Sequence, residues 1–489
     1  MPTQSHPTPS GKDRDMSGEM SSGAEIRPHA KGHRRRALTT LLVGALVGLL
    51  AANALSPASA AAGDISTVAG SGIAGCSGDG GPATSAQLTN PQGMAVDSAG
   101  NVYIADWGCN VVRRIDATTG VITTVAGNGG PGYTGDGGLA TSAQVGGPGD
   151  VALDSAGNLY ISMIGEGQPG HVVRRVDAVT GIITTVAGTG TPGDGGDGGP
   201  AASALLLGPF GIDVDSAGNL YIADAGSNRI RRVDAASGII TTVAGNGIRG
   251  FTGDGVPATN TALNSPFDVL VNPNGNLYIA DGDNCRVRRV DAVTGIITTV
   301  VGGNGCSNAG QEGVATAVAI GRPWLMDMDA AGNLFWGEAD SHRVRKLDLA
   351  TGMTTIVAGT GVRGSSGDGG PATSAQLNEP IGVALNQAGD LFVAESAFSP
   401  PGGHRVRKVE AAGAPVTTST TSTSTTLAPT TTSTSTTLAP TTTTTQAPPT
   451  GVPTTKDQCK DGGWQSFGFR NQGQCVSFVA SRGKSGRGA

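Results

Sequence analysis

The sequence predicts an all-β fold in which six similar modules close into a ring, and three observations lead to this prediction. A phrase that reads roughly T-V-A-G, G-D-G-G-P-A, P-x-G-x-x-V-D-x-x-G-N-L-Y-I-A-D and R-R-V-D-A-x-T-G-I-I-T recurs six times within residues 64–410. The glycine that ends each T-V-A-G (T-V-V-G in the fifth copy) lies at Gly70, Gly127, Gly188, Gly245, Gly302 and Gly359, so the repeats are 57 to 61 residues apart. Each repeat holds four short runs rich in Val, Ile, Tyr and Thr, which favour β-strands. This period and strand content are typical of the blades of a β-propeller.

The four strands of a blade are named a to d here, from the centre of the ring outward. In the third repeat they are expected at residues 211–214, 220–223, 229–233 and 239–244. Strands a and b are joined by D-S-A-G-N, and strands c and d by D-A-A-S-G, so each tight turn has a late glycine where a positive φ is needed. The b–c loop and the d–a connection through G-D-G-G-P-A are longer. In an up-and-down blade both long loops open on one face of the ring, the top face, and we expect function there.

The ends of the repeat region predict how the ring closes. A T-V-A-G strand at residues 65–70 precedes the first complete repeat, and the last repeat ends after its strand c at residues 405–410. The N-terminal strand can therefore supply the missing outer strand of blade 6 and remove an exposed edge. We predict a six-bladed propeller closed by an N-terminal seam.

The motif L-x-x-P-x-G-x-A-V-D-x-x-G-N-x-Y-I-A-D, followed by N-R-I-R-R-V-D at residues 228–234, resembles the NHL-repeat propellers. The added G-D-G-G-P-A connection, at residues 252–258 in one copy, is similar to that of teneurin-type NHL domains and of secreted bacterial NHL-repeat proteins. The resemblance covers residues 64–410 of 489. It implies the fold, but this family includes ligand-binding domains, adhesion modules and a few lyases, so the fold does not give the function.

The segments outside the repeats predict export. Residues 1–60 contain Arg34 to Arg36, an apolar stretch at 38–50 and Ala58-Ser59-Ala60, which is the order of a secretory signal peptide with a long basic region. A retained membrane anchor is the alternative; the preferred interpretation leaves no transmembrane anchor in the mature chain. The twin-arginine route, and Met16 or Met20 as the start, also stay open.

Residues 411–455 are predicted to be a Thr/Ser/Pro-rich linker that cannot bury enough apolar surface to fold and that forms a disordered, O-glycosylated stalk. Residues 456–489 are predicted to be a small C-terminal element that contains Cys459 and Cys475. Such a short element needs a disulfide to hold a shape. Its role is either attachment to the cell envelope or that of an inert or processed tail.

Six cysteines fall into three close pairs, which suits an exported protein. We expect Cys76 to pair with Cys109 and Cys285 with Cys306, each linking a long top-face loop to a b–c loop, while free thiols are the alternative. The net charge of −6 and an aromatic content of 4% argue against nucleic-acid binding.

Polar residues that recur in every blade are expected to be structural. The acids of the G-D-G-G phrase are predicted to cap turns or accept backbone N–H groups, with peripheral Ca²⁺ binding as the alternative. These acids are Asp79, Asp136, Asp197, Asp254 and Asp368, with Glu312 in the fifth copy. The paired arginines of strand c, such as Arg113 with Arg114, are predicted to form ion pairs with acids on neighbouring strands such as Asp106, Asp224 and Asp281.

Three histidines, His171, His342 and His404, share one register before strand c. A zinc site is the alternative for them, but strand c lies two strand spacings outside the innermost strand, so side chains in this register diverge from the axis. We therefore expect a structural or surface role. No other cofactor is expected.

Residues that differ between blades are better candidates for function. The residue after the proline that opens strand a is Gln92, Gly149, Phe210, Phe267, Trp324 and Ile381 in turn. Acids follow two or four residues after that proline in four blades only, at Asp150, Asp268, Asp213 and Asp327. We expect Phe210, Phe267 and Trp324 to form a ligand site with these acids at the top mouth of the channel. The alternative is that they fill the channel and coordinate water.

The b–c loops of blades 2 and 6 are longer than that of blade 1, and ring closure makes these three blades neighbours. The sequence predicts an apolar ridge of Trp107, Met163, Ile164 and Phe398 on this rim, which is typical of a partner-binding patch, with loop drift as the alternative.

The leading functional hypothesis is a secreted or envelope-associated, monomeric propeller that binds an extracellular protein or glycan through its top-face loops. No nucleophile elbow, H-E-x-x-H motif or Walker loop occurs in the sequence. A resemblance to gluconolactonase-type propellers, which hold a metal with acids near the channel mouth, leaves a metal-dependent lactonase or lyase as the alternative.

Overall fold

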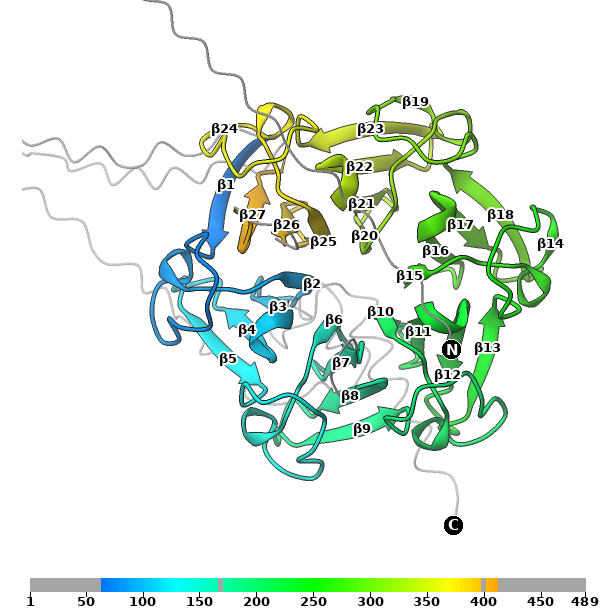
Figure 1. The fold of residues 1–489 in the computed structure, drawn as a ribbon, viewed down its shortest axis with the longest axis horizontal. Helices are drawn as coiled ribbons and strands as arrows, with labels where there is room; N and C mark the ends of the chain where they lie inside the picture. Colours follow the sequence, from blue (N-terminus) through cyan, green and yellow to red (C-terminus); the bar gives the residue numbers. More distant parts are fainter. Residues whose placement is uncertain (1–62, 166–169, 397–401, 412–489) are drawn as a thin grey trace, which may run out of the picture. The chain divides into compact units, whose positions relative to one another are not determined.

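Six antiparallel sheets surround a central axis in the computed structural model, which describes residues 63–165, 170–396 and 402–411 (Figure 1). The predicted signal peptide, the linker, Phe398 and the C-terminal element with Cys459 and Cys475 lie outside these residues. The all-β, six-bladed propeller predicted from the repeat is confirmed.

The strands of each blade run from the centre outward in the following order. Blade 1 comprises β2 (Pro91–Val96), β3 (Val102–Asp106), β4 (Val111–Ile115) and β5 (Ile122–Ala126); blade 2 comprises β6 (Pro148–Leu153), β7 (Leu159–Met163), β8 (Val172–Val176) and β9 (Ile183–Ala187). Blade 3 comprises β10 (Pro209–Val214), β11 (Leu220–Asp224), β12 (Arg229–Val233) and β13 (Ile240–Ala244); blade 4 comprises β15 (Pro266–Val271), β16 (Leu277–Asp281), β17 (Arg286–Val290) and β18 (Ile296–Val301). Blade 5 comprises β20 (Met326–Met328), β21 (Leu334–Glu338), β22 (Arg343–Asp348) and β23 (Met353–Ala358); blade 6 comprises β25 (Pro380–Leu385), β26 (Leu391–Glu395), β27 (Arg405–Val409) and β1 (Asp64–Ala69).

The helices described in the structure are three-residue 3-10 turns of two kinds. One kind lies in the d–a connections, at Ala83–Ser85, Ala140–Ser142, Ala201–Ser203, Ala258–Asn260, Ala315–Ala317 and Ala372–Ser374. The other kind follows strand b, at Trp107–Cys109, Ala225–Ser227, Gly282–Asn284 and Ala339–Ser341. Among the described residues, none of these is long and apolar enough to cross a membrane.

The seam closes as predicted. Strand β1 pairs antiparallel with β27, with Ile65 opposite Val409 and Thr67 opposite Arg407. A further short strand, β24 (Gly370–Pro371), pairs with the outer side of β1, a contact that the sequence analysis did not anticipate. Equivalent strands β14 (Val256–Pro257) and β19 (Gly313–Val314) cover the outer strands of blades 4 and 5. The G-D-G-G connection therefore pairs with the edge of the blade that it leads into.

The hydrophobic core lies between neighbouring blades. One cluster joins Ile104 and Ile122 of blade 1 to Phe392 and Ala394 of blade 6. A ring of six fully buried arginines also supports the blades: Arg113, Arg174, Arg231, Arg288, Arg345 and Arg407. Blade packing therefore depends on buried charges as well as on apolar surface.

These arginines confirm the predicted ion pairs. Arg113 lies 3.9 Å from Asp106, Arg231 lies 3.6 Å from Asp224, and Arg288 lies 3.3 Å from Asp281. The second arginine of each pair does not follow the prediction. Arg114, for example, forms an ion pair at 3.2 Å with Asp116, which lies two residues later in the sequence and not on a neighbouring strand.

The acids of the G-D-G-G phrase have a structural role, as predicted, but a larger one. Asp79 accepts the backbone N–H of Thr124 at 3.0 Å and also forms an ion pair with Arg113. The same pairing joins Asp136 to Arg174 and Asp254 to Arg288. These acids therefore bind the buried arginines of their own blade.

Candidate functional site

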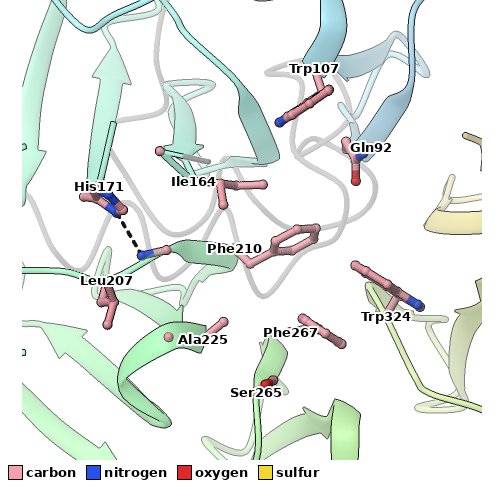
Figure 2. A pocket seen from close by; sticks show the side chains of 13 residues that line it. Gln92, Trp107, Ile164, His171, Leu207, Phe210, Ala225, Ser265, Phe267 and Trp324 are labelled. Atoms are coloured by element: carbon pink, nitrogen blue, oxygen red, sulfur yellow. Dashed lines mark hydrogen bonds between the residues drawn. The ribbon is translucent and has the colours of Figure 1, made fainter. Parts of the chain in front are cut away.

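A pocket lies at the top mouth of the central channel and is lined by residues of blades 1 to 5. We call it the mouth pocket; it has a volume of about 350 Å³. Its lining comprises Gln92, Trp107, Ile164, Gly165, His171, Leu207, Gly208, Phe210, Ala225, Gly226, Ser265, Phe267 and Trp324. Figure 2 shows that the aromatic side chains come from different blades and converge on one space. The position after the opening proline of strand a supplies four of these residues, because it places one side chain per blade at the mouth.

The aromatic rings contact one another directly. Phe267 and Trp324 are stacked, with ring centroids 4.3 Å apart and planes 2° from parallel. Phe210 is tilted against both, at 5.8 Å from Phe267 and 5.7 Å from Trp324. Such mutual packing holds large side chains in fixed positions, so the apolar wall of the mouth pocket is built in advance of any ligand.

Polar groups in the mouth pocket are few. Gln92 is 2% exposed, and Figure 2 shows its side-chain oxygen directed between Phe210 and Trp324. His171 Nδ1 accepts the backbone N–H of Gly208 at 3.0 Å, so the ring proton resides on Nε2 (Figure 2). Burial lowers the pKa of His171 below 6.5, which makes the ring neutral at pH 7. The described lining therefore contains no positively charged side chain.

The four blade-specific acids lie in a different cavity from the aromatic residues, which corrects the expectation of one shared site. A channel cavity of about 220 Å³ is lined by Asp150, Asp213, Asp268 and Asp327 together with aliphatic residues such as Met94, Leu153 and Leu385. The aromatic side chains are absent from this lining, and the acids are absent from that of the mouth pocket.

Each acid reaches across to the innermost strand of the next blade. Asp150 accepts the backbone N–H of Ile212 at 3.0 Å. The other three bonds run from Val271 to Asp213 at 2.8 Å, from Met326 to Asp268 at 2.7 Å, and from Leu385 to Asp327 at 2.7 Å. These N–H groups face the channel and would otherwise be buried without a partner. The acids thus join blades 2 to 6 in sequence.

Glycines in the preceding blade make room for two of these acids. A Cβ atom on Gly93 would lie 1.8 Å from Asp150 Oδ1, and one on Gly211 would lie 2.0 Å from Asp268 Oδ1. Blades 1 to 4 therefore alternate Gly, Asp, Gly, Asp at one register of strand a, and this alternation is visible in the sequence.

Burial dominates the electrostatics of these acids. It raises the pKa of Asp213 to about 7 and that of Asp327 to about 6. Burial, with repulsion from Asp213 and Asp327, also raises the pKa of Asp150 well above 3.8. Burial and the nearby charge of Asp150 do the same for Asp268. Neutral and ionised carboxyls therefore coexist in the channel near pH 7.

The predicted rim ridge is wrong for two of its members. Met163 is fully buried in the core between blades 1 and 2, and Ile164 is 6% exposed. Ile164 and the half-buried Trp107 instead line the mouth pocket. Met163 occupies the strand-b register that holds buried Asp106 in blade 1, which is why it faces inward.

The histidines have the structural role that the sequence predicts. His171, His342 and His404 are in the left-handed backbone region, with φ of 60°, 53° and 56°. Their Nδ1 atoms accept N–H groups from the next blade, of Gly208, Glu379 and Asn90 respectively. Asn110 does the same in blade 1, accepting the Gly147 N–H at 2.9 Å.

Both cysteine pairs in the described part of the chain form the predicted disulfides, Cys76 with Cys109 and Cys285 with Cys306. In residues 63–165, 170–396 and 402–411, no three His, Cys, Asp or Glu side chains are placed to hold a metal ion together. The structure thus offers no preformed metal centre within these ranges.

Comparisons with known proteins support the fold and the repeat type. A sequence model of the teneurin NHL domain matches residues 63–131 and 188–250. Human Teneurin-1 is 28% identical over 383 residues, which cover 68% of this chain and 13% of the relative. Human NHL repeat-containing protein 2 is 26% identical over 296 residues, which cover 55% of this chain and 40% of the relative. The chain thus matches less than half the length of each relative.

Solved structures show the same fold at low identity. An auxiliary nutrient binding protein from Bacteroides ovatus superposes with a TM-score of 0.50 at 17% identity, covering 71% of this chain and 76% of that one. A protein of unknown function from Bacteroides thetaiotaomicron has a TM-score of 0.51 at 19% identity, covering 71% of this chain and 75% of that one.

Proposed function

We propose, from the premise that this chain belongs to the NHL-repeat β-propeller proteins, that it is a binding module whose mouth pocket takes an extracellular protein or glycan. The observation that carries the proposal is the mouth pocket itself. Trp107, Phe210, Phe267 and Trp324 meet there around a few polar groups. A concave, largely apolar site with a small number of oriented polar groups is the usual form of a ligand site in proteins.

The residues of the mouth favour binding over catalysis. His171 uses Nδ1 to hold the Gly208 backbone, so it is not paired with a nucleophile through that atom. In the cavity below, Asp268 accepts the N–H groups of Val269 and Met326, at 2.8 and 2.7 Å. These bonds account for the channel acids without a metal, so the alternative of a metal-dependent lactonase or lyase gains no support from the geometry.

The proposal places the protein outside the cytoplasm. Disulfides such as Cys76–Cys109 persist in oxidising compartments, and the predicted signal peptide and stalk suit display at the cell envelope. A protein that shares this fold is described as an auxiliary nutrient binding protein, and the proposal extends a binding role to this chain.

Binding of the full chain to glycan arrays and to isolated cell envelopes tests the proposal. Trp324→Ala and Phe267→Ala remove one ring each from the stacked pair, and each is expected to weaken binding about tenfold or more, as for an aromatic residue at the centre of an interface. Ile248→Ala is the matched control, because Ile248 is an exposed apolar residue (66%) in an outer loop away from the mouth pocket. Binding that survives both mouth variants would contradict the proposal.

A further inference from the structure

Gln92 presents a hydrogen-bond acceptor that the fold does not use. Its side chain is 98% buried, and among the described residues its Oε1 has no hydrogen-bond partner. Figure 2 shows this oxygen directed between Phe210 and Trp324, in the wall of the mouth pocket. A buried acceptor without a partner is unfavourable, and a ligand that donates a hydrogen bond there removes the cost. A ligand with a donor at this point would therefore be favoured.

The walls around that acceptor favour a positive charge. The faces of Phe and Trp rings are electronegative and attract cations that approach within about 6 Å of the ring centre. Phe267 and Trp324 use one face each to stack on one another, so the surface that they and Phe210 offer to a cation on one side of Gln92 is that of the faces left unstacked. Trp107 lies on the other side (Figure 2). No Lys or Arg belongs to the described lining, so nothing there repels a cation.

Two of the channel acids lie next to residues of the mouth pocket. Asp268 directly follows Phe267 in the chain, and its Oδ1 lies against the backbone of Gly211, beside Phe210. Asp150 occupies the same layer and also contacts Gly93, which follows Gln92. A cation at the mouth would lower the pKa values that burial raises in both carboxyls and so favour their ionised forms.

The scarcity of polar groups selects among cations and, of the two ligand classes proposed above, favours a protein over a glycan. A sugar or a guanidinium presents many hydroxyl or N–H groups that each need a partner when buried. The mouth pocket offers one unused buried side-chain acceptor among the described residues, so an ion with few N–H groups and several carbons fits it better.

We propose that the mouth pocket recognises an alkylammonium group, whose carbons lie against Phe210, Phe267 and Trp324 and whose N–H is accepted by Gln92 Oε1. This inference rests on the proposed binding function and assigns its ligand chemistry. The same group occurs in free amines and in lysine side chains of proteins, so the test separates the two sources.

Three probes of similar size test the charge and the N–H separately: trimethylammonium, which has one N–H; tetramethylammonium, which has none; and neutral tert-butanol. Titrations of the full chain at pH 7.5, followed by tryptophan fluorescence and by calorimetry, should show the two ions binding at millimolar concentrations. Tert-butanol should bind at least about fivefold more weakly than either ion.

Two variants assign the contacts. Gln92→Leu should weaken trimethylammonium about fivefold and leave tetramethylammonium unchanged, whereas Trp324→Leu should weaken both ions about tenfold. Ile248→Ala should change neither. An unchanged circular dichroism spectrum and unfolding midpoint will show that each variant folds. The proposal is overturned if tert-butanol binds as well as the ions, or if Gln92→Leu affects both ions equally.

A peptide that contains N-methylated lysine distinguishes the sources. Binding at least about tenfold tighter than trimethylammonium indicates a protein partner, and equal binding indicates a free amine. If no ion binds at about 100 mM while Trp324→Ala still abolishes binding to envelopes or glycans, this inference fails and the proposed function stands. If the mouth variants leave binding to envelopes and glycans unchanged, the proposed function fails instead.

Discussion

Replacement of Asp136 by Asn should destabilise the propeller more than the equivalent replacement of Asp79. Both acids form an ion pair with a buried arginine, both side chains are 47% exposed, and both accept one backbone N–H from strand d. Their arginines differ. Arg113 has a second, fully buried acid, Asp106, at 3.9 Å, whereas blade 2 carries Met163 at that register. Among the described residues, Asp136 is the acid that forms an ion pair with Arg174, the buried arginine of blade 2.

The magnitude follows from the charge that each change leaves behind. Removal of one partner from a buried ion pair costs about 3 to 5 kcal/mol, because the other charge stays buried. We reduce this to about 2 to 4 kcal/mol for Asp136→Asn, since Arg174 keeps its bonds to the carbonyls of Gln144 and Thr134. For Asp79→Asn we expect about 1 to 2 kcal/mol, since Asp106, whose pKa burial raises to about 7, loses the repulsion from Asp79 and can ionise beside the arginine.

Urea unfolding of both variants and of the wild type, followed by circular dichroism at one temperature, measures the difference. Met163→Asp in the Asp136→Asn background should recover part of the loss, because it restores the acid that the other blades have at this position. Equal losses for the two single variants, or no recovery in the double variant, would refute the reasoning.

Two further predictions concern the channel. Burial raises the pKa of Asp213 to about 7 in the folded chain. Between about pH 4 and 7 the folded chain therefore keeps a proton that the unfolded chain releases, and the stability that this proton provides is lost as the pH rises. Urea unfolding should therefore show that the stability of the wild type relative to Asp213→Asn falls by about 2 kcal/mol between pH 5 and pH 7.5, and a constant difference would contradict it. Gly211→Ala should lower the unfolding free energy by about 1 to 3 kcal/mol, because the added methyl group meets Asp268. The control is Gly238→Ala, whose methyl group meets nothing within 4 Å but lies at a φ of 68°, and it should cost only about 1 kcal/mol. Equal costs measured by urea unfolding would argue against the close inter-blade contact.

The repeat predicted the ring, the seam and both described disulfides, because these depend on phase and count alone. It did not predict where single side chains point. Asp268 was expected beside Phe267 at the mouth, yet it bends toward an N–H group of the next blade, and the sequence does not say which N–H groups lack a partner. Met163 could have been placed correctly, since alignment of the repeats gives it the same position in blade 2 that the buried Asp106 has in blade 1. The unused acceptor of Gln92 is a property of its surroundings and carries no signal in the sequence.

The seam determines whether the ring behaves as one cooperative unit. Ile65 on β1 and Ile240 on β13 occupy the same register of an outer strand, and both are fully buried. If the seam is as firmly packed as an ordinary blade, Ile65→Ala and Ile240→Ala should each cost about 2 to 5 kcal/mol and should differ little.

Deletion of residues 64–70 removes Ile65 and Ala69 from the core and unpairs the backbone of β27 and β24. Each buried backbone group left without a partner costs about 1 to 3 kcal/mol, so the sum approaches the total stability of roughly 5 to 15 kcal/mol of a folded domain. Size-exclusion chromatography should then show an opened or aggregated chain, whereas a chain truncated after residue 415 should keep the elution volume and unfolding midpoint expected of an intact ring. If both truncations are equally stable, β1 does not close the ring. The strands would then pair in a different order, and the top face that forms the mouth pocket would differ from the one described.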